Sequence, residues 1–346
     1  MLRGFAVLIM VALCPAVACC EQAEGVGADA VPEFETYDEM RTRFGELYAE
    51  GRLEEGAGLL EWALPRFPDN VLANSFNLAI VSCRLERYER AIEVMEYAHE
   101  RGFWFNAYAM GADLWAPLRE SARFEGVLER NEALRAESQK TSEPDRLVLT
   151  PEGYEEGKEY PLFIALHGGG SNIAEFRDVW TSEKLKTEFV VAHLQSSLLV
   201  GMGSYDWMQD LNVTRAEIAD AYQILIEEYA IAENEVIVGG FSSGGAASLE
   251  VAFTNVVPVK GFVVLCPRSP DGFTDENVKA AHGRGLRGAI LTTEMDPALE
   301  AQRGMADVLE GAGIPHRFVV TPDVGHWIPD DLGEQIDSSI DHIRGE

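Results

Sequence analysis

The stretch that decides the fold reads Val236-Ile237-Val238-Gly239-Gly240-Phe241-Ser242-Ser243-Gly244, and a helix-forming run, 246–252, follows it. A strand, a tight Gly-x-Ser-x-Gly turn and a helix in direct succession place a serine on a sharp strand-to-helix corner. Glycines are expected at 240 and 244, because side chains two residues from the serine would clash with a neighbouring strand or helix. We therefore predict that Ser242 is a nucleophile held on a strained turn.

A second glycine-rich turn follows the apolar strand expected at 161–166, and it reads His167-Gly168-Gly169-Gly170. A serine that attacks a carbonyl needs two N–H groups converging on the oxyanion, one from the next residue and one from such a loop. The expected donors are Ser243 and either Gly169 or Gly170, with His167 bracing the loop. The nucleotide-binding patterns Gly-Lys-Ser/Thr and Gly-x-Gly-x-x-Gly do not occur, so phosphate binding is not predicted.

Two further polar groups follow the serine in chain order. The strand expected at 287–293 ends in Glu294-Met295-Asp296-Pro297, and the strand-like run 317–320 precedes Val324-Gly325-His326. Asp296 lies 54 residues after Ser242, and His326 lies 30 residues after Asp296. These spacings leave room for helical crossovers, so parallel strands bring all three groups to one edge of a sheet. His326 is the candidate base, and Asp296 is the acid expected to orient it, with Glu294 as the alternative.

These motifs resemble those of the α/β-hydrolase superfamily, especially lid-less esterases similar to dienelactone hydrolases, phospholipase/carboxylesterases and bacterial polyester depolymerases. The resemblance extends from about Arg146 to the C-terminus. It implies a mostly parallel sheet with helices on both faces, in which Ser242 attacks, His326 carries the proton and Asp296 orients the imidazole. Such esterases usually have a glycine two residues before the acid, where this chain has Glu294, so both acids stay open.

The resemblance also implies hydrolysis of carboxylic esters through an acyl-enzyme, without a cofactor. Serine peptidases use the same triad, and an inactive hydrolase fold could serve as a binding module of the cell envelope, so both are alternatives. Only about twenty residues separate the strand at 261–265 from the strand near Ala289, too few for a lid domain. We therefore expect an open site for a small or polymer-borne ester. The apolar loop 196–211 either forms a pocket wall or packs under neighbouring loops. Its candidate pocket residues are Tyr205, Trp207 and Met208.

The N-terminal residues 1–18 have the pattern of a secretory signal, with a basic residue before the apolar run 5–13. Small residues precede Cys19, as in lipoprotein processing, which would attach a lipid to that cysteine. Ordinary cleavage after Ala-x-Ala is the alternative, and a retained membrane anchor is disfavoured because the run is short and Pro15 follows it. We expect export to the periplasm or outer surface as a lipoprotein, or secretion.

A Gly/Ala/Glu-rich tether is expected at 19–35, and helical periodicity begins at its end. A spacing of 34 residues then recurs, which is the tetratricopeptide period. The matched positions are Phe44 with Leu78, Tyr48 with Ser82 and Ala57 with Ala91. We predict a tetratricopeptide-like domain at 36–138, with a plain helical bundle as the alternative, before the α/β domain at 139–346. The helical domain either binds a protein or peptide partner or shields the α/β domain.

The composition limits the partners, since 58 acidic and 28 basic residues give a net charge of −30. Without a Lys/Arg cluster, such a chain is not expected to bind nucleic acid, and its expected link to a membrane is the lipid anchor alone. The sequence has no His-Glu-x-x-His or paired Cys-x-x-Cys motif, so no metal site is predicted. Cys83 and Cys266 are expected as buried thiols, and His193 as a structural residue of a strand.

Overall fold

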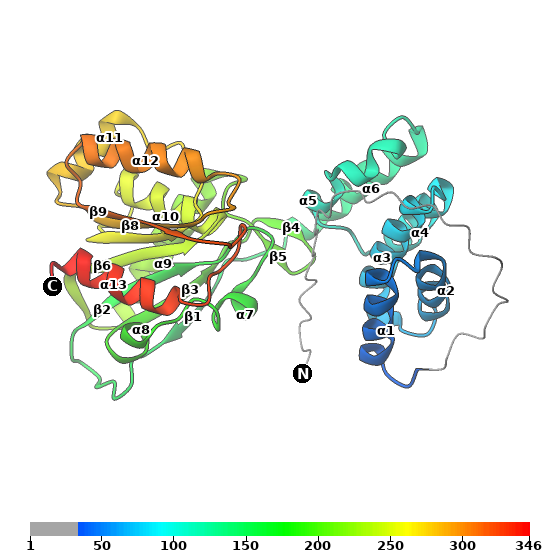
Figure 1. The fold of residues 1–346 in the computed structure, drawn as a ribbon. Helices are drawn as coiled ribbons and strands as arrows, with labels where there is room; N and C mark the ends of the chain where they lie inside the picture. Colours follow the sequence, from blue (N-terminus) through cyan, green and yellow to red (C-terminus); the bar gives the residue numbers. More distant parts are fainter. Residues whose placement is uncertain (1–33) are drawn as a thin grey trace. The chain divides into compact units, whose positions relative to one another are not determined.

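The computed structural model describes residues 34–346, and the expected signal, Cys19 and most of the tether lie outside them. The chain divides between Glu137 and Ser138 into two compact units, which we call the helical unit and the α/β unit. Figure 1 shows helices alone in the first and a sheet with helices in the second. No helix within residues 34–346 is long and apolar enough to cross a membrane.

The helical unit is built from antiparallel helices joined by short turns. Its elements are α1 (Tyr37–Ala49), α2 (Leu53–Ala63), η1 (Pro68–Asn70), α3 (Val71–Arg84), α4 (Tyr88–Glu100), α5 (Ala107–Met110), η2 (Asp113–Leu118) and α6 (Ala122–Gln139). Thr36 begins α1 with a capping box to Glu39. Helix α3 begins 34 residues after α1, and the helices bury one apolar core. The assignment of these helices to the tetratricopeptide class stays a prediction.

The α/β unit contains one seven-stranded sheet with the order β1-β3-β2-β6-β7-β8-β9. Its strands are β1 (Asp145–Leu149), β2 (Tyr160–Leu166), β3 (Val190–Gln195), β6 (Ile231–Phe241), β7 (Gly261–Leu265), β8 (Arg287–Thr293) and β9 (His316–Thr321). All neighbouring pairs are parallel except β1 with β3 at one edge. The expected mostly parallel sheet is therefore confirmed, and the antiparallel edge strand is an addition to it.

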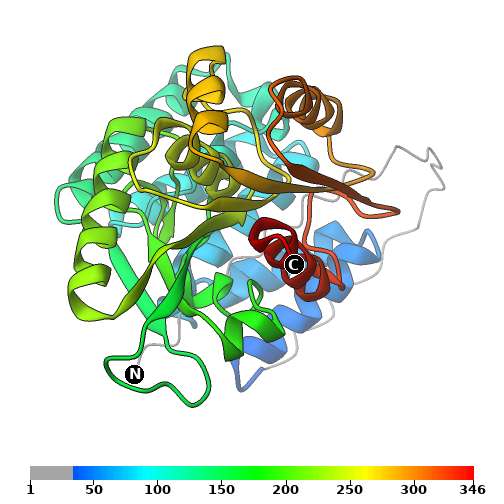
Figure 2. The ribbon, with the colours of Figure 1, turned by 90° about the vertical axis from the view of Figure 1, so that its left-hand side faces the viewer.

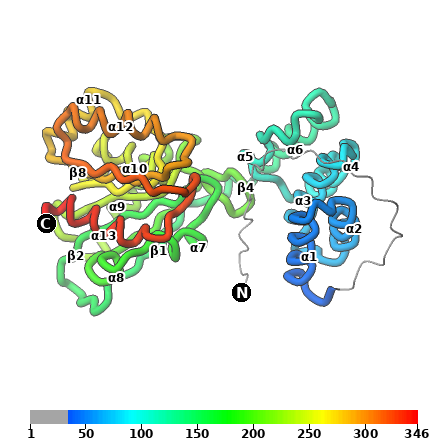
Figure 3. Tube along the Cα trace, viewed as in Figure 1, coloured from blue at the N-terminus to red at the C-terminus, as the bar shows by residue number. Residues whose placement is uncertain are grey.

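Helices cover both faces of this sheet. They are α7 (Ile173–Phe176), α8 (Glu183–Thr187), α9 (Leu211–Glu228), α10 (Ser243–Thr254), α11 (Asp275–Gly283), α12 (Leu299–Gly311) and α13 (Leu332–Arg344). Figure 2 shows α12, in orange, and α13, in red, on opposite sides of the strands. The tube in Figure 3 traces the chain as strands and helices alternate along it, which places one layer of helices on each face of the sheet.

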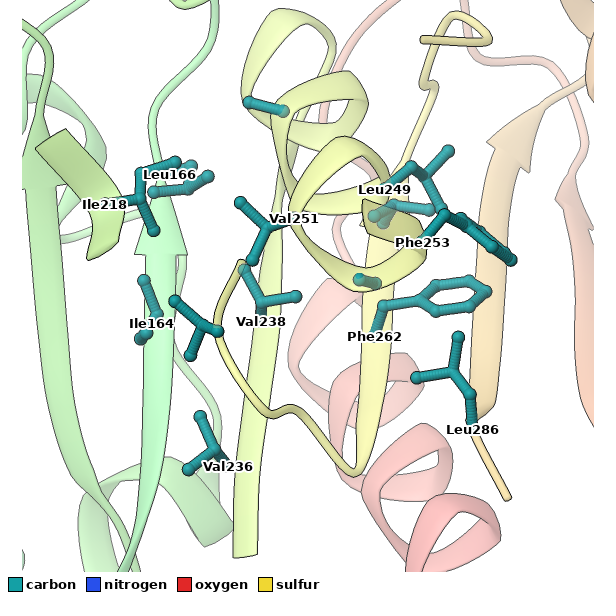
Figure 4. Close-up of a cluster of buried hydrophobic side chains, with 14 of the residues drawn as sticks. Ile164, Leu166, Ile218, Val236, Val238, Leu249, Val251, Phe253, Phe262 and Leu286 are labelled. Carbon is teal, nitrogen blue, oxygen red and sulfur yellow. The ribbon is translucent and has the colours of Figure 1, made fainter. Parts of the chain in front are cut away.

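The alternation of side chains along β2 explains why both faces need cover. Ile164 and Leu166 belong to the core beneath α9 and α10, whereas Phe163 belongs to the core on the other face with Ile336 of α13. Figure 4 shows the first of these cores, where side chains of β2, β6 and α10 meet. Each large apolar side chain buried in this way contributes roughly 1.5–3 kcal/mol. The two cores hold the central strands rigidly, which fixes the loops at their carboxyl ends.

Candidate active site

The turn after β6 holds Ser242 in a backbone conformation that non-glycine residues rarely adopt, with φ 54° and ψ −113°. Glycines flank it because the chain passes close to β2. A Cβ on Gly240 would lie 2.4 Å from the backbone oxygen of Leu166, and one on Gly244 would lie 2.2 Å from the same atom. Both distances are shorter than real Cβ contacts. The strand-turn-helix arrangement expected from the sequence is present, with Ser242 immediately before α10.

Three side chains from the ends of β6, β8 and β9 form one chain of hydrogen bonds. His326 Nε2 lies 2.8 Å from Ser242 Oγ, and His326 Nδ1 lies 2.6 Å from Asp296 Oδ2. A carboxylate only accepts, so the ring proton is on Nδ1 and Nε2 accepts from the serine hydroxyl. This is the geometry of a nucleophile, a base and a group that orients the base.

The structure distinguishes the two candidate acids. Asp296 is buried, and besides His326 its carboxylate accepts from Ala298 N at 2.7 Å. Glu294 is exposed, and its carboxylate accepts instead from Asp323 N at 3.1 Å. Asp296, and not Glu294, therefore lies in position to orient His326.

The environment of Asp296 keeps its carboxyl group ionised. Burial raises the pKa of Asp296, but hydrogen bonds from the Cys266 thiol, the Ala298 amide and His326 outweigh it and lower this pKa below its ordinary value. Cys266, Asp296 and His326 are also the group of metal-ligating side chains that comes together within residues 34–346, with ligand atoms within 4.8 Å of one another. Asp296 and His326 are hydrogen-bonded to each other within this group.

The loop after β2 approaches Ser243, and a Cβ on Gly169 would lie 3.2 Å from Ser243 Cβ. Gly170 N–H donates to Tyr205 O at 2.8 Å, so of the two glycines expected as the loop donor, Gly170 already has an acceptor. Within residues 34–346, no acceptor contacts the N–H groups of Gly169 or Ser243. These two groups remain free to bind an oxyanion, and the N-terminal end of α10 adds a favourable dipole there.

His167 braces this loop from below, as the sequence analysis expected. Its ring is fully buried, and its Nδ1–H donates to Gly168 O at 2.8 Å. Burial lowers the pKa of His167 to about 4, although the hydrogen bond to Gly168 opposes this effect. The imidazole is therefore neutral at neutral pH.

The expected pocket residues have other positions. Trp207 is 1% exposed, and its Nε1 donates to His167 O at 3.0 Å, so it braces the oxyanion loop and its prediction as a pocket wall is wrong. Tyr205, in the small hairpin of β4 (Leu199–Gly201) and β5 (Ser204–Tyr205), is half-buried and binds Gly170 through its backbone. Met208 is half-buried, and its N–H donates to Asp206. The loop packs against the site instead of forming an open wall.

Exposed apolar side chains instead flank the triad. Trp327 is 58% exposed directly after His326, and Met295 is 66% exposed directly before Asp296. The ring of Phe241 lies 5.1 Å from the ring of His326 and 6.4 Å from that of Trp327. Trp327 also lines an open cavity of about 610 Å³. Other residues that line it include Val179, Thr181, Ile328, Glu334 and Asp337. None of Ser242, Asp296 and His326 lines this cavity, so exposed Trp327 and Met295 are the apolar side chains next to the triad residues in the chain.

The sequence analysis missed Asp206. This residue is 1% exposed, and its carboxylate accepts from the hydroxyl of Ser243 and from Met208 N. The sequence signal was weak, because an aspartate in a connecting loop ordinarily lies in solvent.

No protein-family model and no curated protein sequence matches this chain. Among solved structures, an uncharacterized protein from Bacillus cereus ATCC 10987 is similar over 90% of this chain and 99% of its own, with 23% identity and a TM-score of 0.51. A carboxylesterase from Bacillus cereus is similar over 60% of this chain and 99% of its own, with 18% identity and a TM-score of 0.47. Acyl-protein thioesterase 2 from Zea mays covers 56% of this chain and 96% of its own, with 18% identity and a TM-score of 0.44.

The first of these likenesses supports the fold and assigns no activity. The sheet order and the serine on a turn between strand and helix are those of the α/β-hydrolase fold. The fold class is thus established by the topology of the chain itself, and the function has to be argued from the site.

Proposed function

We propose that this chain is a serine hydrolase that cleaves carboxylic esters through an acyl-enzyme intermediate. The observation that carries the proposal is the hydrogen-bonded chain from Ser242 through His326 to buried Asp296. The strained backbone of Ser242 supports it independently, since such strain persists where the surrounding structure holds a functional group in place.

In the first half of the reaction, Ser242 Oγ attacks the carbonyl carbon of the ester while His326 Nε2 takes the hydroxyl proton. Asp296 stabilises the imidazolium that forms. The negative charge that develops on the carbonyl oxygen faces the N–H groups of Ser243 and Gly169, and one such donor is worth about 2.7–4 kcal/mol. When the tetrahedral intermediate collapses, His326 returns the proton to the departing alcohol.

In the second half, water attacks the acyl group on Ser242, and His326 takes a proton from that water. Collapse of the second tetrahedral intermediate releases the carboxylic acid and restores the serine hydroxyl. No cofactor takes part in either half. The imidazole acts once as base and once as acid in each half, which its position between Ser242 and Asp296 allows.

We propose a small or polymer-borne ester as the substrate. The triad is reached from the surface, since His326 is exposed and Trp327 and Met295 project beside it. This arrangement suits an ester carried on a larger molecule better than a buried long-chain lipid. A strong preference for emulsified long-chain triglycerides over short-chain esters would contradict this part of the proposal.

The proposed setting is the cell envelope. We propose that the chain is exported and processed before Cys19, which would receive a lipid. We propose further that the helical unit binds a protein or peptide partner. A Cys19→Ala variant that stays in the membrane fraction as strongly as the unchanged chain would contradict the lipid anchor.

The test is hydrolysis of p-nitrophenyl butyrate by the chain from Glu21 onward. We expect Ser242→Ala to lower turnover about 10⁴-fold or more. Ser338→Ala, which changes an exposed serine of α13 whose hydroxyl accepts from Arg317, is the matched control and should keep full activity. Hydrolysis of peptide p-nitroanilides in place of esters would indicate a peptidase. A folded chain active on neither would favour a binding module.

A further inference from the structure

Asp206 is a buried acid in the loop before α9. Its side chain is almost inaccessible to solvent, and within residues 34–346 no Lys, Arg or His forms an ion pair with it. A buried carboxylate costs several kcal/mol unless hydrogen bonds compensate it. An apolar side chain would fill the same space at lower cost. The buried hydrogen-bond acceptor at this position therefore calls for an explanation beyond packing.

The two carboxylate oxygens face the two sides of the expected oxyanion hole. Oδ1 accepts from the hydroxyl of Ser243 and from Met208 N, the latter at 2.9 Å. Oδ2 lies against Gly169, only 3.0 Å from the point that a Cβ on this glycine would occupy. One side chain thus contacts both residues whose N–H groups would bind the oxyanion.

The connections around Asp206 close into a ring. Ser243 Oγ donates to Asp206 and accepts from Trp207 N at 3.3 Å. Trp207 holds the loop after β2 through His167 O, and Tyr205 O holds Gly170 N. Asp206 N–H donates to Leu198 O at 2.9 Å, which fixes the acid to its own hairpin. The loop before α9, the loop after β2 and the start of α10 are joined at this carboxylate.

We infer that Asp206 is a positioning residue that sets the spacing of the two oxyanion donors, Ser243 N–H and Gly169 N–H. This inference rests on the proposed esterase function. The Asp206 side chain contacts the Ser243 hydroxyl and Gly169, not the reacting atoms. It therefore acts on the reaction only through these two residues. Its contribution belongs to the transition state, where the carbonyl oxygen carries charge and the donors must lie within about 2.7–3.1 Å of it.

Asp206→Ala removes both contacts, so we expect kcat for p-nitrophenyl butyrate to fall about 10- to 100-fold while KM changes by no more than about threefold. Affinity for a trifluoromethyl ketone, which forms a tetrahedral adduct with the serine, should fall by the same factor. Asp206→Asn keeps an oxygen that accepts from Ser243, so most of kcat should remain. Each kcat is divided by the fraction of sites that a fluorophosphonate labels.

Two companion variants separate positioning from stability. Asp210→Ala changes an exposed acid of the same loop, which caps α9 through Asn212 N at 2.9 Å, and should lower stability while kcat per labelled site stays unchanged. Ser243→Ala removes the hydroxyl that donates to Asp206 but keeps the N–H group. The double variant Asp206→Ala/Ser243→Ala should have nearly the same kcat as Asp206→Ala, because both changes break the same hydrogen bond between Ser243 and Asp206.

Equal kcat per labelled site in Asp206→Ala and Asp210→Ala would overturn the inference, as would an equal loss in Asp206→Asn and Asp206→Ala. Fully additive effects of Asp206→Ala and Ser243→Ala would also overturn it. If Asp206→Ala does not fold, Ser243→Ala decides the question by itself. It breaks the hydrogen bond to Asp206, so kcat per labelled site should fall, and an unchanged kcat would overturn the inference. An unchanged chain with no Ser242-dependent turnover would refute the proposed function itself and remove the basis of the inference.

Discussion

Acid should destabilise the α/β unit because two buried histidines are held neutral in the folded chain. Burial lowers the pKa of His193 to about 4, helped by the nearby charge of Arg177, and burial also lowers the pKa of His167 to about 4. In the unfolded chain both rings have the ordinary value of about 6.5. Between these two pH values, the unfolded chain binds protons that the folded chain does not.

The sign follows directly, since stability rises with pH wherever the unfolded state binds more protons. The stability held by each neutral histidine is complete above pH 6.5 and is lost as the pH falls toward 4. The difference between a pKa of about 6.5 and one of about 4 corresponds to a free energy of at most about 3 kcal/mol for each ring. Of this, about 2 kcal/mol per ring is lost between pH 7 and pH 5.

The perturbation is His193→Phe, which keeps an aromatic ring beside Phe176 and removes Nδ1, a buried atom without a hydrogen-bond partner. Urea unfolding at pH 7 and at pH 5 gives the free energy of unfolding at each pH. The decrease in this free energy from pH 7 to pH 5 should be about 2 kcal/mol smaller in the variant than in the unchanged chain. His282→Gln, which changes an exposed histidine of α11, is the control and should keep the original loss. An equal loss in His193→Phe and the unchanged chain would refute the reasoning.

Two further predictions concern the triad and its turn. Asp296→Asn should lower kcat for p-nitrophenyl butyrate about 10³- to 10⁴-fold because His326 loses the acceptor that fixes its tautomer, while Glu294→Gln should change it less than threefold. Steady-state kinetics checks both, and a larger loss in Glu294→Gln would reverse the assignment. Gly244→Ala should destabilise the α/β unit by about 3 kcal/mol or more, because the new Cβ would lie 2.2 Å from Leu166 O. Calorimetry measures this change, and an unaltered midpoint would contradict it.

Features set by a few neighbouring residues could be predicted from the sequence. The strand, turn and helix around Ser242 lie where the local pattern placed them, because glycine spacing and apolar runs act within one turn of chain. The strand at Arg287–Thr293 has the predicted bounds for the same reason. The edge strand β1 was not predicted, since its five residues are exposed or half-buried and carry little periodic signal.

Some choices that depend on contacts between distant segments could not be made from the sequence. Asp296 and Glu294 are two residues apart, and the choice between them depends on the fold. His326, from a distant segment, contacts Asp296, whereas the Glu294 carboxylate accepts from Asp323 N. The sequence did not show that Gly170 N–H donates to Tyr205 O of the β4–β5 hairpin. Trp207 was a candidate for a pocket wall because its side chain is large and mostly apolar. The sequence does not reveal that its indole N–H donates to His167 O in a distant loop.

The central claim is that Ser242 carries the acyl group during turnover. The most direct measurement is mass spectrometry of the peptides of the active chain after rapid acid quench during turnover of p-nitrophenyl butyrate, and in parallel after fluorophosphonate labelling. We predict a butyryl adduct and a phosphonate adduct, both on Ser242, and neither in the Ser242→Ala variant. Adducts on another residue, or active protein in which Ser242 stays unmodified by the phosphonate, would contradict the account.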